Sequence, residues 1–286
     1  MISGENESEI QKSPIGIFDS GFGGLTVLSE IKSLLPQYSY IYLGDNLRAP
    51  YGNRSFETVY QFTSQAVKWL FNQNCELVIL ACNTASAKAL RTIQQKDLPS
   101  ISASKRVLGV IRPTAEVVDH ISRSGHVGIL GTSGTVKSES YQIELAKLHP
   151  HMTLVSEACP MWVPLVENQE YDKPGADYFV KQHIENLLSK DDKIDTIILG
   201  CTHYPLLINK IKTYLPKHIR IISQGKYVAL SLQRYLERHP KIEQKCSKEG
   251  VVKYYTTDSA DEFNAFASSY LKEDISAQKI KIDTPC

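Results

Sequence analysis

Apolar runs alternate with amphipathic segments along most of the chain, and this alternation predicts strands and helices in turn. Short uncharged runs such as 15–18 and 77–80 are typical of strands buried on both faces of a parallel sheet. Between them, apolar residues recur at helical spacing, as Leu25, Leu28 and Ile31 do. Strands and helices in regular alternation predict an α/β fold with doubly wound parallel sheets.

The same order of features occurs twice. A strand and a glycine-rich turn at 15–24 are followed, further along, by an apolar strand that ends in a small residue and Cys82. A second such strand and turn at 127–135 are followed, after a similar number of residues, by a strand that ends at Cys201. This repetition predicts an internal duplication. We therefore expect two flavodoxin-like parallel-sheet domains that are related by pseudo-twofold symmetry.

The repeat also suggests where the domains begin and end. We expect residues 14–109 plus 221–286 to form a first domain that carries Cys82, with the last segment returning across the linker. Residues 110–220 form the predicted second domain, which carries Cys201. Residues 1–13 are polar and are expected to be a flexible tail.

Charge and composition narrow the classes of function. The chain of 286 residues has 32 Lys and Arg against 31 Asp and Glu, a formal net charge of +1. This balance does not favour binding to nucleic acid or to a membrane surface. No apolar run approaches the roughly 20 residues that span a bilayer, and the polar start lacks the apolar core of a signal peptide. We therefore expect a cytoplasmic protein.

The six cysteines are scattered and none form a Cys-x-x-Cys pair, which argues against a disulfide framework and against a zinc ribbon. Four of them fit best as small buried core residues: Cys75, Cys159, Cys246 and Cys286.

Cys82 and Cys201 differ from the other four because each ends a predicted strand and is followed by polar residues. In open α/β sheets, ligands bind at the carboxyl ends of strands. After Cys82, Asn83 or Thr84 is suited to cap a helix. After Cys201, Pro205 is suited to open one.

Four interpretations of the pair compete. Both cysteines can be core residues, although the duplication and the polar neighbours argue against this. A metal site would use Cys201 and His203, but further ligands are not apparent in the sequence. A Cys-His hydrolase would use Cys201 as its nucleophile and leaves Cys82 unexplained. In the fourth interpretation, the two thiols act as an acid–base pair on a carbon acid.

The fourth interpretation has a physical basis. A helix N-terminus can lower the pKa of a thiol toward neutrality. One thiolate then removes a proton from one face of a stereocentre while the other thiol delivers a proton to the opposite face. The negative charge that develops needs stabilising donors, for which the candidates are the helix N-termini with Asn83, Thr84, Ser133 and Thr202.

Five segments in order resemble glutamate racemase, of the aspartate/glutamate racemase family. They are IGIFDSGFGGLTVL at 15–28, YLGDNLRAPYGNRS at 42–55, ILACNTAS at 79–86, ILGTSGTV at 129–136 and LGCTHYPLL at 199–207. The resemblance implies a pyridoxal-independent enzyme that interconverts L- and D-glutamate and supplies D-glutamate for peptidoglycan synthesis. It also implies a bacterial, cytoplasmic homodimer that holds no metal or cofactor.

The resemblance implies roles for individual residues. Cys82 and Cys201 match the two acid–base residues, and Asp19, Glu167 and His203 match the polar residues that assist them. Aspartate racemases usually carry an acidic residue at the position of His203, so this histidine favours glutamate as the substrate. The substrate contacts implied are Asp19, Ser20, Tyr51, Gly52, Asn83, Thr84, Thr132, Thr202 and His203.

The sequence departs from the family pattern at two places. Ser223-Gln224-Gly225 stands where an Asp-Ser-Gly-like motif is usual, and Arg112-Pro113-Thr114 stands in place of a more glycine-rich linker. The first departure affects polar contacts behind the site, and the second affects domain closure. A racemase for another amino acid, such as aspartate, a Cys-His hydrolase and a non-catalytic amino-acid sensor remain the alternatives.

Overall fold

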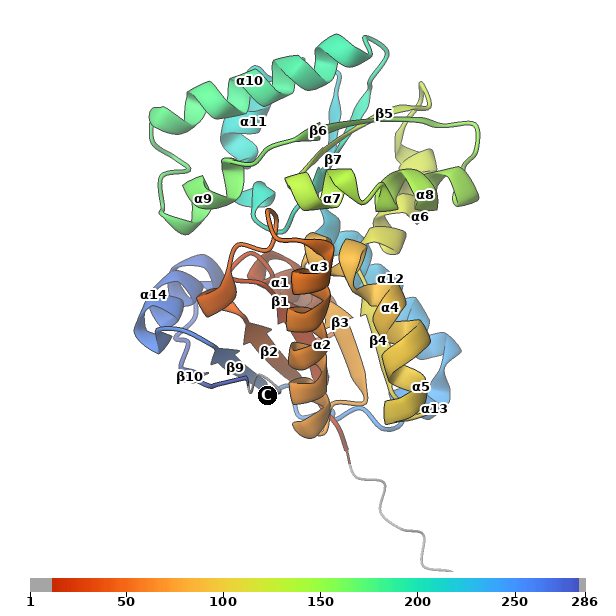
Figure 1. Cartoon of the computed structure of the whole chain (residues 1–286), viewed down its shortest axis with the longest axis vertical. Coiled ribbons are helices and arrows are strands. Elements are labelled where there is room, and N and C mark those ends of the chain that lie inside the picture. Colours follow the sequence, from red (N-terminus) through yellow and green to blue (C-terminus); the bar gives the residue numbers. More distant parts are fainter. Residues whose placement is uncertain (1–11, 283–286) are drawn as a thin grey trace, which may run out of the picture.

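The computed structural model describes residues 12–282, which form two α/β lobes, one above the other in Figure 1. Within this range the strands form two sheets, and every pairing between neighbouring strands is parallel. The larger sheet has the order β10-β9-β2-β1-β3-β4 and the smaller has the order β6-β5-β7-β8. The strands are β1 Ile15–Asp19, β2 Tyr40–Gly44, β3 Leu77–Leu80, β4 Arg106–Gly109, β5 His126–Gly131, β6 Thr153–Ala158, β7 Thr196–Gly200, β8 Arg220–Ile222, β9 Val252–Thr256 and β10 Ala277–Lys279.

The two sheets share one topology. β2-β1-β3-β4 in the larger sheet corresponds to β6-β5-β7-β8 in the smaller one, and β9 and β10 extend the larger sheet at one edge. The strands that precede Cys82 and Cys201, β3 and β7, therefore occupy equivalent positions. The predicted fold class, two flavodoxin-like parallel-sheet domains, is confirmed.

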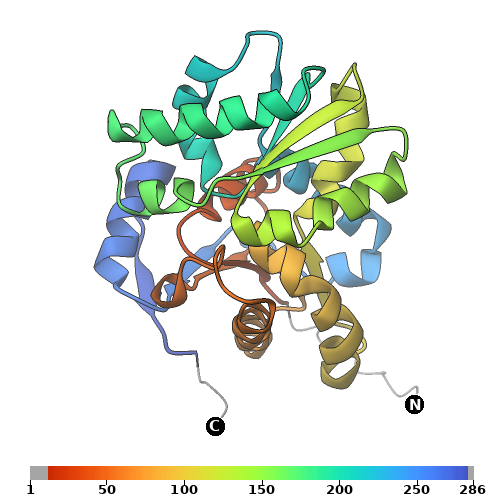
Figure 2. The ribbon, with the colours of Figure 1, turned by 45° about the horizontal axis from the view of Figure 1, so that its top comes forward.

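Helices cover both faces of each sheet. In the turned view, α10 crosses one face of the smaller sheet, and α6 and α8 lie on its other side (Figure 2). The helices are α1 Leu25–Leu34, α2 Phe56–Asn72, α3 Asn83–Lys88, α4 Leu90–Thr92, α5 Leu98–Ile101, α6 Ile111–Ile121, α7 Ser133–Lys137, α8 Ser140–Leu148, α9 Trp162–Glu167, α10 Gly175–Lys190, α11 Ile208–Tyr214, α12 Gln224–Arg238, α13 Pro240–Glu243 and α14 Ala260–Leu271. Short 3₁₀ turns occupy Asn46–Arg48 and Tyr204–Leu207, and a π-helical turn occupies Ile93–Asp97.

Alternate residues of each strand enter different cores, which explains the uncharged runs in the sequence. In β1, Ile17 packs with α1, α12 and α14 on one face, and Phe18 packs with α2 on the other. In β7, Ile197 packs toward α9, α10 and α11, and Ile198 packs toward α6 and α8. Burial on both faces leaves no solvent-facing side on these central strands.

The chain crosses between the lobes after β4 and again after β8. All three residues of β8 pair with β7 in the smaller sheet, and the last pair is Ile222 with Ile198. The second crossing therefore lies just past the boundary that was expected after residue 220. The domain limits as a whole stay a prediction. After the second crossing, α12 packs on α1 in the first lobe and also contacts α6 in the second.

One local expectation was wrong. Arg112–Thr114 is not a linker but lies in the first turn of α6, where proline is tolerated because those N–H groups lack helical acceptors. The helical segment that follows Cys82 extends beyond α3 and α4. It continues through the π-helical turn into α5, with Pro99 near the start of that helix. The charged span 239–249 includes the short helix α13.

The start of the chain is described from Lys12 onward. Ser13 is buried and forms a bridge with Cys246, so this part of the predicted tail is paired with the first lobe. Residues 1–11 of the predicted tail, and Cys286, lie outside the described residues. Cys75, Cys159 and Cys246 are free and buried, as predicted.

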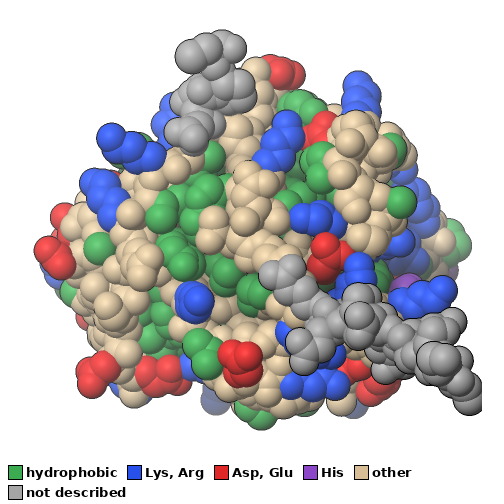
Figure 3. All heavy atoms as spheres, turned by 90° about the horizontal axis from the view of Figure 1, so that it is seen from below, with side chains coloured by type: hydrophobic (Ala, Val, Ile, Leu, Met, Phe, Trp, Pro, Cys, Tyr) green, Lys and Arg blue, Asp and Glu red, His purple; other side chains and the backbone are tan. Residues whose placement is uncertain are grey.

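The surface of the larger lobe carries basic and acidic side chains interspersed with apolar ones, in keeping with the near-zero net charge (Figure 3). None of the helices between residues 12 and 282 is long and apolar enough to cross a bilayer.

Candidate active site

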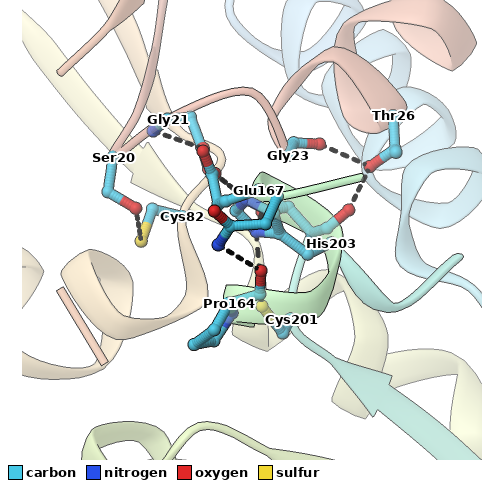
Figure 4. Close-up of polar contacts among 12 residues, drawn as sticks. Ser20, Gly21, Gly23, Thr26, Cys82, Pro164, Glu167, Cys201 and His203 are labelled. Carbon is cyan, nitrogen blue, oxygen red and sulfur yellow. Dashed lines mark hydrogen bonds and ion pairs between the residues drawn. The ribbon is translucent and has the colours of Figure 1, made fainter. Parts of the chain in front are cut away.

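The two cysteines singled out from the sequence lie where the lobes meet. Cys82 follows β3 and Cys201 follows β7, and each side chain is only 6 % exposed. Both sulfur atoms appear in the close-up of Figure 4, together with Ser20, Glu167 and His203. The equivalent strands therefore deliver one thiol from each lobe to a common region.

Cys82 itself caps helix α3, whereas the sequence suggested Asn83 or Thr84 for this role. Its sulfur accepts a hydrogen bond from the Ala85 amide and donates one to the hydroxyl of Ser20, both at 3.5 Å. Burial and the nearby Asp19 carboxylate raise the pKa of Cys82 to about 12. The resting side chain is therefore a neutral thiol, and the expected lowering by the helix N-terminus is outweighed.

Cys201 lies beside a histidine that is itself held by a carboxylate. Nδ1 of His203 is 3.7 Å from the sulfur, and Nε2 is 2.5 Å from Oε1 of Glu167, the last residue of α9. Burial alone would lower the pKa of His203, but its contacts with Cys201 and Glu167 outweigh burial and raise that pKa well above the ordinary value. The raised pKa favours the protonated imidazolium form of His203, which lies between Cys201 and Glu167.

Asp19, at the end of β1, links the two lobes. It is fully buried, accepts a hydrogen bond from the Gly21 amide at 3.0 Å and accepts another from the Thr202 hydroxyl at 3.2 Å. Burial raises the pKa of Asp19, although the charge of His203 and these hydrogen bonds act in the opposite direction. The carboxylate thus faces the Cys201 side of the site, and Ser20 is the residue bonded to Cys82.

The glycine-rich turn after β1 allows this close approach. A Cβ atom on Gly23 would lie 2.4 Å from His203 Nδ1 and 2.4 Å from Thr202 Oγ1. Any larger residue at this position would displace the histidine, so the glycine is required for the approach of the two lobes. Thr26 strengthens the contact, because its hydroxyl lies 3.0 Å from the Thr202 carbonyl oxygen.

A second group of predicted residues joins the starts of α3 and α7. Thr132 caps α7, and its hydroxyl lies 2.9 Å from that of Thr84. The Gly134 amide, in the same turn, donates a hydrogen bond of 2.8 Å to the carbonyl of Gly52. Residues of the two equivalent helix starts therefore meet across the lobes, with the Gly52 loop beside them.

Tyr51 occupies a different environment from the other predicted contacts. Its hydroxyl donates to Asp45, a buried carboxylate that also pairs with Arg48 at 2.6 Å. The Tyr51 ring packs in the first-lobe core against Phe18 and Phe62. Its polar atom is thus occupied within the lobe, where it fixes the loop that carries Gly52.

Asn83 belongs to a buried polar cluster that the sequence did not reveal. Its side chain bonds to Gln224 at 2.6 Å and to the Tyr141 hydroxyl at 2.7 Å, and Gln224 bonds to Thr114 at 3.0 Å. These partners lie far apart in the sequence and carry no motif. The only signal was the departure at Ser223-Gln224-Gly225.

A cavity of about 220 Å³ is lined by Cys201 and Thr202, together with Thr26, Glu30, Gln224 and Tyr270 among others. The described residues contain no group of three or more His, Cys, Asp or Glu side chains placed to hold a metal ion. The groups that the two lobes bring to the site include two thiols, one of them beside His203, and thiols can accept and donate protons.

Comparison with known proteins places this geometry in context. Residues 24–229 match the model of the Asp/Glu/Hydantoin racemase family. A glutamate racemase of Sulfurihydrogenibium sp. is 38 % identical over 96 % of this chain and 99 % of its own length. A glutamate racemase of Shouchella clausii is 39 % identical over 95 % of each chain.

Solved structures agree with the sequence matches. A glutamate racemase isoform from Bacillus anthracis superposes with a TM-score of 0.86 at 37 % identity, covering 94 % of this chain and 98 % of its own. The glutamate racemase of Francisella tularensis in complex with D-glutamate gives a TM-score of 0.84 at 29 % identity, covering 95 % and 98 %.

Proposed function

The chain belongs to the Asp/Glu/hydantoin racemase family and is an amino-acid racemase, and we propose that it interconverts L- and D-glutamate through Cys82 and Cys201. The arrangement of the two cysteines carries this proposal. Each thiol follows the equivalent strand of a duplicated lobe, and the two lobes bring them to one site.

The similarity to glutamate racemases supports glutamate as the substrate. The relatives named above are glutamate racemases that match this chain over nearly their whole length, and the Francisella tularensis structure is a complex with D-glutamate. His203, where aspartate racemases usually carry an acid, is consistent with this choice. Asn83, Thr84, Thr132 and Thr202 are the proposed polar contacts to substrate, together with Asp19, Ser20 and the loop of Tyr51 and Gly52.

The two thiols begin the reaction in different protonation states. We assign the first base to Cys201, because the imidazolium of His203 lies 3.7 Å from its sulfur and offers a counter-charge to a thiolate. Cys82 starts as the thiol, because its pKa is raised to about 12 by burial and by Asp19. The free enzyme is thus ready for proton transfer in one direction.

In that direction the Cys201 thiolate takes the α-proton of glutamate, and the C–H electron pair moves into the α-carboxylate. Cys82 then gives its proton to the opposite face of the α-carbon and becomes a thiolate. The product is the other enantiomer, with the protonation states of the two cysteines exchanged. The reverse reaction follows the same steps backward. Before another turnover in the first direction, Cys201 loses its proton to solvent and Cys82 takes one up, so proton transfer balances the cycle.

The remaining residues assist these transfers. Glu167 holds His203 in place and keeps it charged, and His203 in turn stabilises the thiolate of Cys201. Ser20 orients Cys82 through the hydrogen bond to its sulfur. Asp19 ties the first-lobe turn to Thr202 of the second lobe.

We further propose a cytoplasmic homodimer that supplies D-glutamate for peptidoglycan synthesis. The relatives named above are bacterial, which supports the cell-wall role. Rescue of a D-glutamate-requiring bacterial strain by the gene tests the role, and sedimentation of the purified protein tests the dimer.

Polarimetry tests the proposed reaction. The purified protein is expected to racemise L- and D-glutamate, to leave aspartate unchanged and to be unaffected by added pyridoxal phosphate. Cys82→Ala and Cys201→Ala are each expected to abolish turnover while the circular dichroism spectrum stays native. Full turnover in either variant contradicts the two-thiol assignment.

The contact of Cys201 with His203 and Glu167 favours one second candidate, a hydrolase with a Cys-His-Glu arrangement. A hydrolase would release a product of different mass and would keep its activity in Cys82→Ala. A product of unchanged mass together with an inactive Cys82→Ala variant excludes it.

A further inference from the structure

Gln224 lies at the position where this sequence departs from the family pattern, and its side chain connects the two lobes. It is the first residue of α12, directly after the second crossing between the lobes, and is 3 % exposed. Its amide bonds to Asn83 of the first lobe and to Thr114 and Tyr141 of the second. Thr114 lies on α6, directly after the first crossing, so one side chain bonds at both crossings.

The direction of every hydrogen bond in this cluster is fixed by chemistry. Thr114 donates its single hydroxyl hydrogen to the backbone carbonyl of Val110 at 3.0 Å, which can only accept. Toward Gln224, Thr114 is therefore an acceptor, so the nitrogen of the Gln224 amide must face it. The oxygen of Gln224 must then face Asn83.

The same reasoning orients Asn83. Because the Gln224 oxygen faces it at 2.6 Å, the adjacent atom of Asn83 must be the amide nitrogen. The Asn83 oxygen then accepts from the Tyr141 hydroxyl at 2.7 Å, and Tyr141 accepts the second hydrogen of the Gln224 nitrogen. The cluster closes with each donor matched to an acceptor.

One hydrogen of the Asn83 amide is left over. The nitrogen carries two hydrogens, and among the described contacts one of them goes to Gln224. Asn83 directly follows Cys82 at the start of α3, and its remaining N–H has no protein acceptor among the described contacts. A flipped amide would present its oxygen there and would repel a carboxylate.

We propose that Gln224 is a positioning residue that holds the Asn83 amide with its nitrogen available to a carboxylate of the substrate. This inference rests on the proposed function and adds a residue that touches no substrate. All four side chains of the cluster are at least 97 % buried, so water does not compete for these bonds. Because the partners of Gln224 belong to both lobes, the orientation of the Asn83 amide depends on how the two lobes are arranged.

The test compares three substitutions with a matched control. Gln224→Leu removes the amide, and Tyr141→Phe removes only the hydroxyl that holds the Asn83 oxygen. Gln224→Glu keeps the shape but cannot donate to Thr114. Ser223→Ala is the control, since Ser223 lies in the same turn and makes no side-chain capping bond. KM and kcat are measured for both enantiomers of glutamate, and thermal unfolding checks that each variant is folded.

Each of the three substitutions is expected to raise KM roughly tenfold or more for both enantiomers, with a smaller change in kcat. The control stays within about twofold of the wild type. In an Asn83→Ala background, Gln224→Leu is expected to change KM by less than about twofold, because the residue it positions is gone.

Two results overturn the inference while the proposed function stands. One is a Gln224→Glu or Tyr141→Phe variant with wild-type KM. The other is an equal change of KM on Gln224→Leu in the wild-type and Asn83→Ala backgrounds, which would mean that Gln224 does not act through Asn83. A wild-type protein that does not turn over glutamate is a different failure, since it overturns the proposed function and this inference with it.

Discussion

Nδ1 of His203 lies 3.7 Å from the sulfur of Cys201, and this contact makes two otherwise equivalent thiols chemically different. The duplicated lobes place Cys82 and Cys201 after corresponding strands. The neighbours then diverge, with Ser20 and the start of α3 at one thiol and a charged histidine at the other. The following predictions depend on that difference.

The two thiols are expected to react with iodoacetamide at different rates. Because the pKa of Cys82 is about 12, its reaction in the Cys201→Ala variant should be slow at pH 7 and rise roughly tenfold per pH unit toward alkaline pH. Cys201, measured in Cys82→Ala beside its imidazolium, should be modified first at pH 7. Peptide mass spectrometry assigns each site, and identical profiles would show that the two environments act alike.

Replacing Glu167 is expected to change the pH dependence of the reaction. Contacts with Glu167 and Cys201 raise the pKa of His203 against the effect of burial, so the imidazolium persists until the pH rises through that elevated pKa. In Glu167→Gln the pKa falls, and the alkaline limb of the kcat profile should move to lower pH. A pH profile that does not move would show that Glu167 does not maintain the raised pKa of His203. Glu170→Gln, which changes an exposed ion pair with Lys173, is the control.

The same elevated pKa has a consequence for stability. A folded-state pKa above the unfolded value gives stabilisation that is complete below the unfolded pKa, roughly 6.5 for histidine, and is lost as the pH rises through the folded value. Glu167→Gln should therefore lower the midpoint of urea unfolding most at acidic to neutral pH, and the difference from wild type should shrink at alkaline pH.

The buried carboxyl group of Asp19 is expected to make folding less favourable at neutral pH, although racemisation requires it. Its pKa is raised mainly by burial, so the unfolded chain ionises at lower pH than the folded one, and folding is disfavoured once the pH rises above the unfolded pKa. At pH 7, Asp19→Asn should therefore be more stable than the wild type against urea. At pH 3 this difference should be smaller. Racemisation should be lost in the variant.

Asp195 provides a control of opposite sign for that measurement. Burial would raise its pKa, but hydrogen bonds from Ser122, Arg123 and Ser124, with one from Thr196, lower it to about 2. Asp195→Asn should lose stability at pH 7, where the folded carboxylate contributes. Equal effects of the two substitutions would contradict the assigned directions.

The close approach at Gly23 predicts a large effect from a single methyl group. In Gly23→Ala the new Cβ would meet His203 and Thr202 at 2.4 Å, and the displaced histidine should lower kcat by about 100-fold. Gly175→Ala is a matched control, since a Cβ there has open space. Wild-type kcat in Gly23→Ala would show that the histidine can move without loss.

The sequence was sufficient for the fold and for the paired thiols, because both depend on local pattern. Uncharged runs such as Ile197–Leu199 identify strands buried on two faces, and the repeated position of Cys82 and Cys201 identifies the ends that meet. In contrast, β10 was missed, because Ala277–Lys279 is a short edge strand of mostly polar residues.

Long-range contacts account for the rest of what the sequence did not reveal. The cap of α3 comes from Cys82 itself, a residue rarely expected to cap. Gln224 reaches Asn83, Tyr141 and Thr114 across 141, 83 and 110 positions, and no local propensity encodes such a cluster. Only the folded arrangement of both lobes shows that these amides and hydroxyls satisfy one another.

The most direct test of the two-thiol account is the fate of the α-proton of L-glutamate in D₂O, followed by NMR at the earliest measurable conversion. With one base on each face, the proton removed by one thiol cannot return to the other face. The D-glutamate first formed should therefore carry deuterium at the α-carbon, while the remaining L-glutamate is still protiated. D-glutamate that retains the original α-proton would mean that a single base serves both faces, and would contradict the roles given to Cys82 and Cys201.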